Sequence, residues 1–475
     1  MRNCNTPKCP KRIVIIGAGP TGLGAAHRLT ELGHENFVVY ERNSYVGGLS
    51  SSFYDEKGFT WDFAVHVAHS HYHYVDQLMD SLLPGGYFHH ERKSWIRDYD
   101  SWIPYPFQYN FRHLPPQHCD ECLNGLLQLR MQTDVEKHTA KAHSIQNFKE
   151  WMLQGFGEGI TRHFMLPYNL KNWSIDPALM GVQWLGDRVP VVDVERVQRN
   201  LRENRDDVEW GPNHVFQFPK RGGTGSIWRE MAARLPENRI TLSSEVVSVD
   251  GKSRKVQLAD GTVDEYDCLI STAPLPRLAQ WLAIPSLMVT ASKLKYTHVY
   301  VMGLGFDSPM PKHLAEKTWI YCPGTRDVFY RVTPFSNFSP HHVPDINGSS
   351  SFLCEISRAG TEPLQNPGDF LSRVLQDMNR MGVMPESEHE VHTYPMTAEF
   401  GYPIPTLDRD DILAELMAQL EPLGIISRGR FGGWKYEVAN MDHSIMQGVE
   451  AVNRILGVGE ECTWPNPSRV NAGKS

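Results

Sequence analysis

Short apolar runs alternate with an amphipathic stretch near the start of the chain. Residues 13–16 are all β-branched and apolar, which is typical of a parallel strand buried on both faces. A glycine-rich turn and an alanine- and leucine-rich helical pattern follow, and a second apolar run covers residues 37–40. This order of strand, turn, helix and strand predicts a parallel α/β unit.

The pattern changes twice further along the chain. Between about residues 115 and 205, apolar and charged positions alternate with few turn signals, which predicts helices around 126–131 and 148–156. From about 213 to 400, short runs separated by Gly, Pro and Asn predict strands at 215–218, 240–249, 255–258, 299–304 and 352–356. We expect residues 268–271 to return to the parallel sheet and residues 428–434 to form a further strand. The last helix should present Ile445, Val449, Val452 and Ile455 on one face.

Composition excludes several classes of protein. The chain has 475 residues and a formal charge of −8, which disfavours a nucleic-acid binder because such proteins normally carry a basic face. No apolar run approaches the ~20 residues that cross a bilayer, so we expect no membrane association. We predict a cytoplasmic globular protein. The oligomeric state is left open.

The first turn carries a dinucleotide-binding pattern. Gly17, Gly19 and Gly22 follow the first strand and open the helix, and Glu41 ends the second strand 19 residues after Gly22. In such turns the glycines allow a tight bend and close approach to a pyrophosphate, while the acid reaches the ribose. An ordinary glycine-rich turn would not explain Glu41.

A second glycine pair narrows the choice between dinucleotide cofactors. Gly47, Gly48, Leu49 and Ser50 follow the ribose acid closely. Such a pair is typical of FAD-binding oxidoreductase folds, and domains that bind only NAD seldom need it. We therefore predict FAD.

The cysteines and histidines offer weak metal signals. Cys119 and Cys122 form a CxxC downstream of His113 and His118, but no second pair lies at a zinc-site interval. His66, His69, His71 and His73 are also clustered, in a segment that we place beside FAD. We interpret the cysteines as free thiols and predict no metal site.

Long motifs elsewhere carry a family resemblance. They are PYPFQ at 104–108, FMLPYNLKNW at 164–173, WLGDRV at 184–189, WGPNHVFQFPKRGGTGSIW at 210–228, FYRVTPFSNFSP at 329–340, GYPIPTLDRD at 401–410 and SRGRFGGWKYEVANMDHS at 427–444. Together they resemble the eukaryotic type of UDP-galactopyranose mutase, over about residues 11–460.

The resemblance implies a domain plan within an α/β fold. A discontinuous FAD-binding Rossmann-like domain would cover residues 11–112, 205–235, 262–282 and 425–460. A helical insertion domain would cover 113–204, and an antiparallel β-sheet domain that binds substrate would cover 236–261 and 283–424.

The resemblance also implies an activity. Members of the family interconvert UDP-galactopyranose and UDP-galactofuranose with reduced FAD, whose N5 attacks the anomeric carbon and expels UDP before the ring closes again at the other size. NADPH or NADH is expected to reduce the flavin first. The substrate would be a UDP-sugar.

Residues at matched motif positions acquire expected roles. Two arginines suit a departing diphosphate because a guanidinium can donate two hydrogen bonds to paired oxygens. The catalytic set is His66, Arg188 and Arg331. Further flavin contacts are Arg92, Ser94, Arg430, Asn440, Asp442 and Ser444, and the substrate set is Tyr105, Phe107, Gln108, Asn169, Trp173, Asn213, Tyr321, Tyr402 and Tyr436. Each arginine could instead bridge a carboxylate, and each aromatic could be a core residue.

Four matched positions depart from the family pattern. The Gly-Gly-His loop is Ala64-Val65-His66, and valine does not readily take the positive φ that glycine allows. His69 replaces an aromatic, Phe338 lacks a tyrosine hydroxyl expected near the diphosphate, and Met441 replaces a glutamine. Other readings therefore stay open: a related enzyme acting on another nucleotide sugar or metabolite, an FAD oxidase of the amine-oxidase type, or an inactive paralogue.

Overall fold

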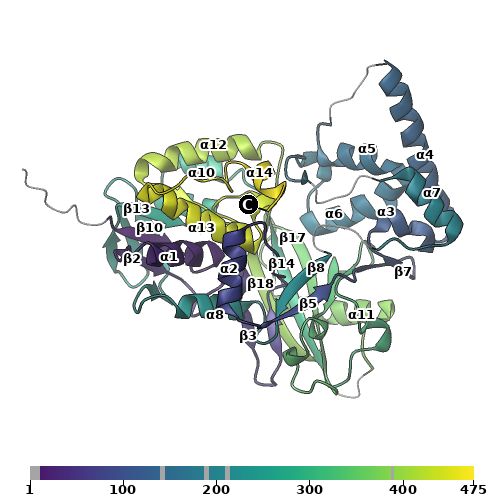
Figure 1. The fold of residues 1–475 in the computed structure, drawn as a ribbon, viewed down its shortest axis with the longest axis horizontal. Helices are drawn as coiled ribbons and strands as arrows, with labels where there is room; N and C mark the ends of the chain where they lie inside the picture. Colours follow the sequence, from purple (N-terminus) through teal and green to yellow (C-terminus); the bar gives the residue numbers. More distant parts are fainter. Residues whose placement is uncertain (1–10, 140–144, 187–191, 209–213, 387–389, 475) are drawn as a thin grey trace, which may run out of the picture.

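A computed structural model describes residues 11–139, 145–186, 192–208, 214–386 and 390–474. Three parts are visible in Figure 1: a parallel sheet with its helices, a group of helices, and a large sheet between and below them. No helix in these described ranges combines the length and apolar composition that a membrane span requires.

The first part is built on a five-stranded parallel sheet, in the order β19-β13-β1-β2-β9. Every residue of β1 and β2 is buried, as the apolar runs predicted. The strands are β1 (Ile13–Ile16), β2 (Phe37–Tyr40), β9 (Ile240–Thr241), β13 (Cys268–Ser271) and β19 (Ile425–Ser427).

Helices cover both faces of this sheet. One hydrophobic cluster contains residues of β1 together with α1 (Pro20–Glu31), α2 (His73–Leu82), α8 (Gly225–Ala233) and α13 (Met441–Leu456). The other contains residues of α9 (Leu275–Leu282), α10 (Pro285–Ala291), α12 (Arg409–Leu420), β10 (Val246–Asp250) and β11 (Lys255–Leu258). Strands β10 and β11 form a small antiparallel sheet with β12 (Val263–Glu265). The predicted apolar face of the last helix is confirmed in α13.

Helices α1 and α13 lie backbone against backbone. A Cβ added at Gly24 would stand 2.6 Å from the Ile445 carbonyl oxygen, and one at Gly448 would stand 2.1 Å from the Thr21 carbonyl oxygen. Only glycine permits this approach, so the first turns of the two helices are fixed relative to one another.

The large sheet has the order β18-β14-β17-β16-β15-β6-β7. Its strands are β18 (His392–Pro403), β14 (Tyr296–Phe306), β17 (Ser350–Ala359), β16 (Arg331–Pro334), β15 (Ile320–Tyr321), β6 (Trp95–Asp98) and β7 (Ser101–Pro104). α11 (Leu371–Met381) packs into the apolar cluster on this sheet. Two small antiparallel sheets pair β5 (Tyr87–Glu91) with β8 (Val215–Pro219), and β3 (Ser52–Tyr54) with β4 (Thr60–Asp62).

The helical part packs around its own apolar cluster. It contains α3 (Phe107–Asn110), α4 (Pro116–Thr139), α5 (Phe148–Ile160), α6 (Leu166–Trp173) and α7 (Val194–Glu203), and a π-helical turn at Thr161–Met165 joins α5 to α6. A short helix, α14 (Pro467–Asn471), follows α13. The predicted α/β class, with a helical insertion and a second sheet, is confirmed.

Three details of the sequence prediction differ from the structure. Residues 428–434 form no strand, because the strand ends at Ser427 and Gly429 takes a φ of 93°. Residues 240–249 form two strands in different sheets, β9 and β10. Strands β6 and β7 join the large sheet, which makes it mixed, because β6 pairs in parallel with β15. The predicted domain boundaries had placed β6 and β7 with the nucleotide domain and otherwise stay a prediction.

Candidate active site

A cavity of about 620 Å³ opens at the carboxyl ends of β1 and β2. Its walls come from the two glycine loops, the first turn of α13, the loop carrying His66, and residues of β15, β16 and β18 from the large sheet. Crevices at the carboxyl ends of parallel strands are the usual ligand sites of such folds. The cavity therefore spans the parallel sheet and the large sheet.

The first glycine turn exposes backbone atoms, uncovered by side chains, to the cavity. Gly17 has a φ of 97°, and a Cβ on it would stand 2.2 Å from the Thr272 hydroxyl oxygen. A Cβ on Gly22 would meet the Gly17 carbonyl oxygen at 1.9 Å. Within the described chain no side chain caps α1 at Gly19, so the N–H groups of its first turn are available to an anion.

The second glycine pair lies against the first. Gly47 and Gly48 both take positive φ, at 103° and 56°, and a Cβ on Gly48 would stand 3.5 Å from the Gly19 Cα. Ser50 closes this loop by donating its hydroxyl to the Gly47 carbonyl oxygen at 2.9 Å. Leu49 and Ser50 also line the cavity. The two loops form a cradle that side chains would fill.

Glu41 is held at the cavity wall by backbone and amide donors. Its carboxylate accepts hydrogen bonds from the Ala18 amide at 2.8 Å, the Asn43 amide at 2.9 Å and the Asn43 side chain at 2.8 Å. The residue is buried, so these bonds satisfy a charge that burial would otherwise penalise. They fix an acid at the end of β2, as the spacing predicted.

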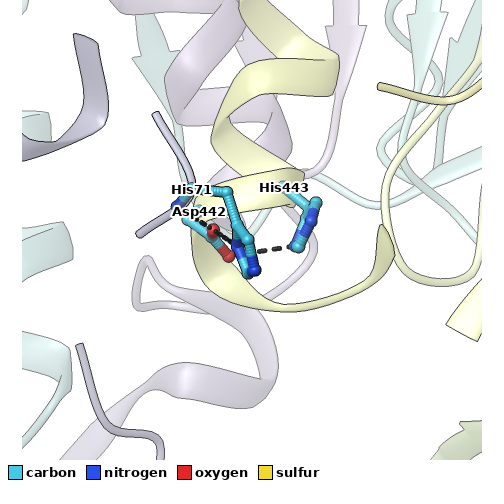
Figure 2. A group of neighbouring side chains, drawn as sticks. All are labelled: His71, Asp442 and His443. Atoms are coloured by element: carbon cyan, nitrogen blue, oxygen red, sulfur yellow. Dashed lines mark hydrogen bonds and ion pairs between the residues drawn. The ribbon is translucent and has the colours of Figure 1, made fainter. Parts of the chain in front are cut away.

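The first turn of α13 carries a buried acid between two histidines (Figure 2). Asp442 accepts from the His71 amide at 3.0 Å and pairs with His71 Nδ1 at 2.8 Å and with His443 Nδ1 at 3.1 Å. Burial opposes its charge, but the charge of His443 and the hydrogen bonds from both imidazoles hold the pKa of Asp442 well below its usual range. Asn440, Met441 and Ser444 also line the cavity.

His66 is partly buried and lines the cavity. Its Nδ1 lies 2.9 Å from the Ala64 carbonyl oxygen, and its own carbonyl accepts from the Thr224 hydroxyl at 2.8 Å. Burial, together with the nearby positive charge of Arg430, lowers the pKa of His66 to about 4. Val65 stands beside it, also lines the cavity and does not take a positive φ.

Arg331 is paired with a buried glutamate. Its Nε and Nη2 each donate to Glu355 at 2.7 Å, and Tyr330 donates to the same carboxylate at 2.7 Å. The pKa of Arg331 is raised well above its usual range because, although burial opposes the charge, Glu355 stabilises it. Arg331 lines the cavity, and its Nη1 has no hydrogen bond to any described residue. Arg331 thus does pair with a carboxylate, the alternative that the sequence left open, but its Nη1 is still available to a ligand.

Two further arginines lie among tyrosines. Arg92 lines the cavity, donates to the Tyr321 hydroxyl at 3.0 Å and to Ser94 at 3.1 Å, and stacks 4.5 Å above the Tyr105 ring. Arg430 donates to the Gly401 carbonyl at 3.1 Å. Its guanidinium lies 5.1 Å from the centre of the Tyr402 ring and 5.7 Å from that of Tyr436.

Most of the predicted substrate residues pack in or against the apolar cluster of the helical part and do not line the cavity. Trp173 packs against Tyr402 and Tyr436, with ring centres 5.7 and 4.9 Å away, and donates to Asn169 at 3.2 Å. Phe107 is buried and stacks on Phe164. Among the described residues of this predicted set, only Tyr321 lines the cavity; the others are Tyr105, Phe107, Gln108, Asn169, Trp173, Tyr402 and Tyr436. Arg188 and Asn213 lie outside the described residues.

The expectation for Phe338 is wrong in its location. Its ring is buried among Phe216, Phe218 and Trp319 and does not line the cavity. A hydroxyl here would face apolar side chains, so its absence removes no donor from the cavity wall of this structure. His69, in contrast, does line the cavity.

Sequence reasoning missed Glu355 and Asp62. Glu355 interrupts an apolar run predicted to be a buried strand, and such a lone acid signals a buried partner. Asp62 is fully buried, and burial raises its pKa to about 6. It accepts from the Thr224 amide at 3.1 Å, and Thr224 in turn holds the His66 carbonyl.

Comparisons with known proteins agree on one family. The model of flavin containing amine oxidoreductases matches residues 20–456. A crystal structure of reduced UDP-galactopyranose mutase is 40% identical, with a TM-score of 0.91 and 98% of each chain covered. A putative protoporphyrinogen oxidase from Exiguobacterium sp. 255-15 shares the fold, with a TM-score of 0.70 over 94% of this chain and 99% of the other, at 17% identity.

Curated relatives match a short segment. A 4,4'-diapophytoene desaturase from Staphylococcus haemolyticus is 48% identical over 50 residues, and a zeta-carotene desaturase from Capsicum annuum is 35% identical over 71 residues. These alignments cover 10% and 15% of this chain, and 10% and 12% of the desaturases.

Proposed function

Because the chain belongs to the flavin containing amine oxidoreductase family, in the branch of the UDP-galactopyranose mutases, we propose that it interconverts UDP-galactopyranose and UDP-galactofuranose. The observation that carries this proposal is a match of fold and sequence to such a mutase over nearly the full length of both chains. The chain is then an isomerase with the fold of an oxidoreductase. A cytoplasmic location stays a prediction.

The cradle fits FAD. The uncapped first turn of α1 and the bare Gly17–Gly19 backbone suit its pyrophosphate, and Glu41 suits its ribose. The first turn of α13 would place N–H dipoles near the flavin ring, where they stabilise negative charge. Bound in its reduced form, FAD would supply the nucleophile that displaces UDP from the sugar. We propose NADPH or NADH as the reductant.

Two arginines would bind the departing UDP. Glu355 orients the guanidinium of Arg331, whose free Nη1 would donate to the diphosphate as charge develops on it. Arg188 would supply the second guanidinium. His66 is neutral above its lowered pKa, so it would contact the flavin ring without adding a charge there.

Direct assay of the reduced protein tests the proposal. Dithionite-reduced holoenzyme should convert UDP-galactofuranose to UDP-galactopyranose, resolved by anion-exchange chromatography, and the oxidised protein should not. Arg331→Lys should lower kcat by about 10²–10³-fold, because one donor to the leaving group is displaced. Arg358→Lys, on β17 beside a different cluster, should retain the wild-type rate. A reduced protein that leaves the furanose unchanged would refute this substrate assignment.

A second candidate keeps the chemistry and changes the sugar or nucleotide. Val65 and His69 both line the cavity, at positions where the family carries glycine and an aromatic residue. A panel of nucleotide sugars, incubated with reduced enzyme, separates the two candidates. Turnover with oxygen and no prior reduction would instead indicate an oxidase.

A further inference from the structure

A second cluster of ligating side chains lies in the helical part, away from the cavity walls. His118 and Glu121 are one helical turn apart on α4, and His163 lies in the π-helical turn between α5 and α6. One ligand atom from each lies within 4.8 Å of the other two. The sequence alone associates His118 with the CxxC motif, but does not point to Glu121 or His163. The chain fold supplies the missing ligand from 42 residues beyond Glu121.

The three side chains already converge. His163 Nε2 lies 2.7 Å from one oxygen of Glu121, and His118 Nδ1 lies 4.0 Å from the other. The two imidazole rings are 4.5 Å apart. A tetrahedral zinc ion with ligands at about 2.0–2.1 Å needs ligand atoms roughly 3.3 Å apart. The observed separations of 2.7 and 4.0 Å lie on either side of that spacing.

One donor atom is buried without a partner. His118 Nδ1 is shielded from solvent and forms no hydrogen bond to any residue that the structure describes. Leaving a polar atom in this state costs free energy, and a bound cation would satisfy it. The side chain as a whole is 27% exposed, so an ion can reach the cluster from solvent.

Neighbouring residues orient the proposed ligands through a hydrogen bond and close helix packing. The Tyr99 hydroxyl lies 2.8 Å from His163 Nδ1, which leaves Nε2 to face Glu121. Metal-bound histidines usually have such a partner on the other nitrogen. His163 is 4% exposed, and a Cβ on Gly159 would stand 2.2 Å from the Glu121 carbonyl oxygen, so α4 and α5 are in close contact here.

The charge balance allows a divalent cation. Glu121 is acidic, and its hydrogen bond with His163 lowers its pKa. Arg162 Nη1 lies 3.7 Å from the same carboxylate but is mostly exposed and also pairs with Glu158, so it can move aside. The CxxC thiols are not part of this cluster, whose ligand atoms come from His118, Glu121 and His163.

We propose that His118, Glu121 and His163 form a binding site for a divalent transition metal of the zinc class. Two imidazole nitrogens and a carboxylate oxygen are a donor set that zinc accepts, with water in the fourth position. Binding moves the remaining proton of His163 to Nδ1, which then donates to Tyr99. The ion would join α4 to the turn that begins α6.

Metal binding to the FAD-loaded, chelator-treated enzyme tests the proposal. We expect one equivalent of Zn²⁺ to remain after gel filtration, measured by mass spectrometry, with an anomalous diffraction peak between the three side chains. His118→Gln and Glu121→Gln should each weaken Zn²⁺ affinity at least about 100-fold. Tyr99→Phe, which removes no ligand, should weaken it by about 10-fold. The exposed His89→Gln is the matched control and should bind as wild type.

Several outcomes would overturn it. Retention of Zn²⁺ by His118→Gln and Glu121→Gln would assign the ion to another site, such as His71, Asp442 and His443. Loss of binding in Cys119→Ser but not in Glu121→Gln would assign it to the thiols. Binding that needs millimolar zinc and leaves Tyr99→Phe unaffected would indicate an adventitious ion only.

Discussion

Arg331 and Glu355 occupy directly opposed positions on the antiparallel strands β16 and β17, and the guanidinium donates two hydrogen bonds of 2.7 Å to the carboxylate. The carboxylate is almost fully buried, and Tyr330 donates to it as well. Bidentate pairing of this kind fixes the orientation of the arginine. The strand register therefore aims the residue that we propose for the diphosphate.

Removal of the Glu355 charge should destabilise the fold and the site together. Glu355→Gln leaves a buried guanidinium without its counter-charge, which we expect to lower the free energy of unfolding by about 3–5 kcal/mol. Urea denaturation followed by circular dichroism measures it. Glu265→Gln, in an exposed pair with Lys255, should cost no more than about 1 kcal/mol. Equal losses in the two variants would contradict the importance given to the buried pair.

The close packing of the two glycine loops predicts that one added methyl group weakens FAD binding without affecting folding. A Cβ on Gly19 would stand 4.0 Å from the Gly48 Cα, an ordinary contact, and the backbone there is extended. Gly19→Ala should therefore fold normally but bind FAD at least about 10-fold more weakly, because the methyl group occupies space meant for the cofactor. Fluorescence titration of apoenzyme with FAD gives the dissociation constant. Gly155→Ala, on α5 with open space around it, is the control; unchanged FAD affinity in Gly19→Ala would refute the cradle.

The lowered pKa of His66 predicts a pH-dependent contribution to stability. The folded-state pKa is about 4 and the unfolded value is 6.5, so acid protonates the unfolded chain first. The contribution is complete above pH 6.5 and is lost as pH falls toward 4, by roughly 3 kcal/mol in total. The unfolding free energy of wild type should therefore fall by about that amount relative to His66→Gln as pH falls from 7 to 4.

Two features keep this comparison interpretable. Asp62, with its pKa raised to about 6, acts in the opposite direction over part of the same range, but it is present in both proteins and cancels in the difference. The charged groups that act on His66 (Arg430, Arg331 and Glu355) are likewise retained. A constant difference between wild type and His66→Gln across the range would show that His66 titrates normally.

Phe338→Tyr tests whether the family hydroxyl can be restored. The ring lies among Phe216, Phe218 and Trp319, so a hydroxyl would be buried without an evident partner and should cost about 1–3 kcal/mol of stability. We expect no gain in mutase rate. Thermal unfolding and kcat of the variant check both points, with Phe88→Tyr as a less buried control. A faster variant of unchanged stability would place the ring in the site after all.

Local patterns were enough to predict one half of the candidate site. The first strand, the glycine turn, α1 and Glu41 follow from hydrophobic periodicity and fixed spacings within about 40 residues. The other half depends on contacts between distant segments. Glu355 meets Arg331 only through the register of β16 and β17, which sequence periodicity does not specify.

Two errors have identifiable physical causes. Residues 428–434 were predicted to form a strand ending in glycines, but buried Arg428 pairs with Glu461, 33 residues away, and Gly429 turns the backbone. Phe338 was assigned to the site by its motif, although an aromatic ring can satisfy the same motif from within a core.

The backbone contact between α1 and α13 has a consequence for how the enzyme can move. Gly24 and Gly448 press together the two helices whose first turns face opposite ends of the proposed flavin. The first turn of α1, which we propose for the pyrophosphate, and the first turn of α13, which we propose for the flavin ring, therefore stay at a fixed distance from one another. An opening that admits a sugar nucleotide would then come from the surrounding loops and the helical part, without a change in the distance between the two helix ends that we propose for FAD.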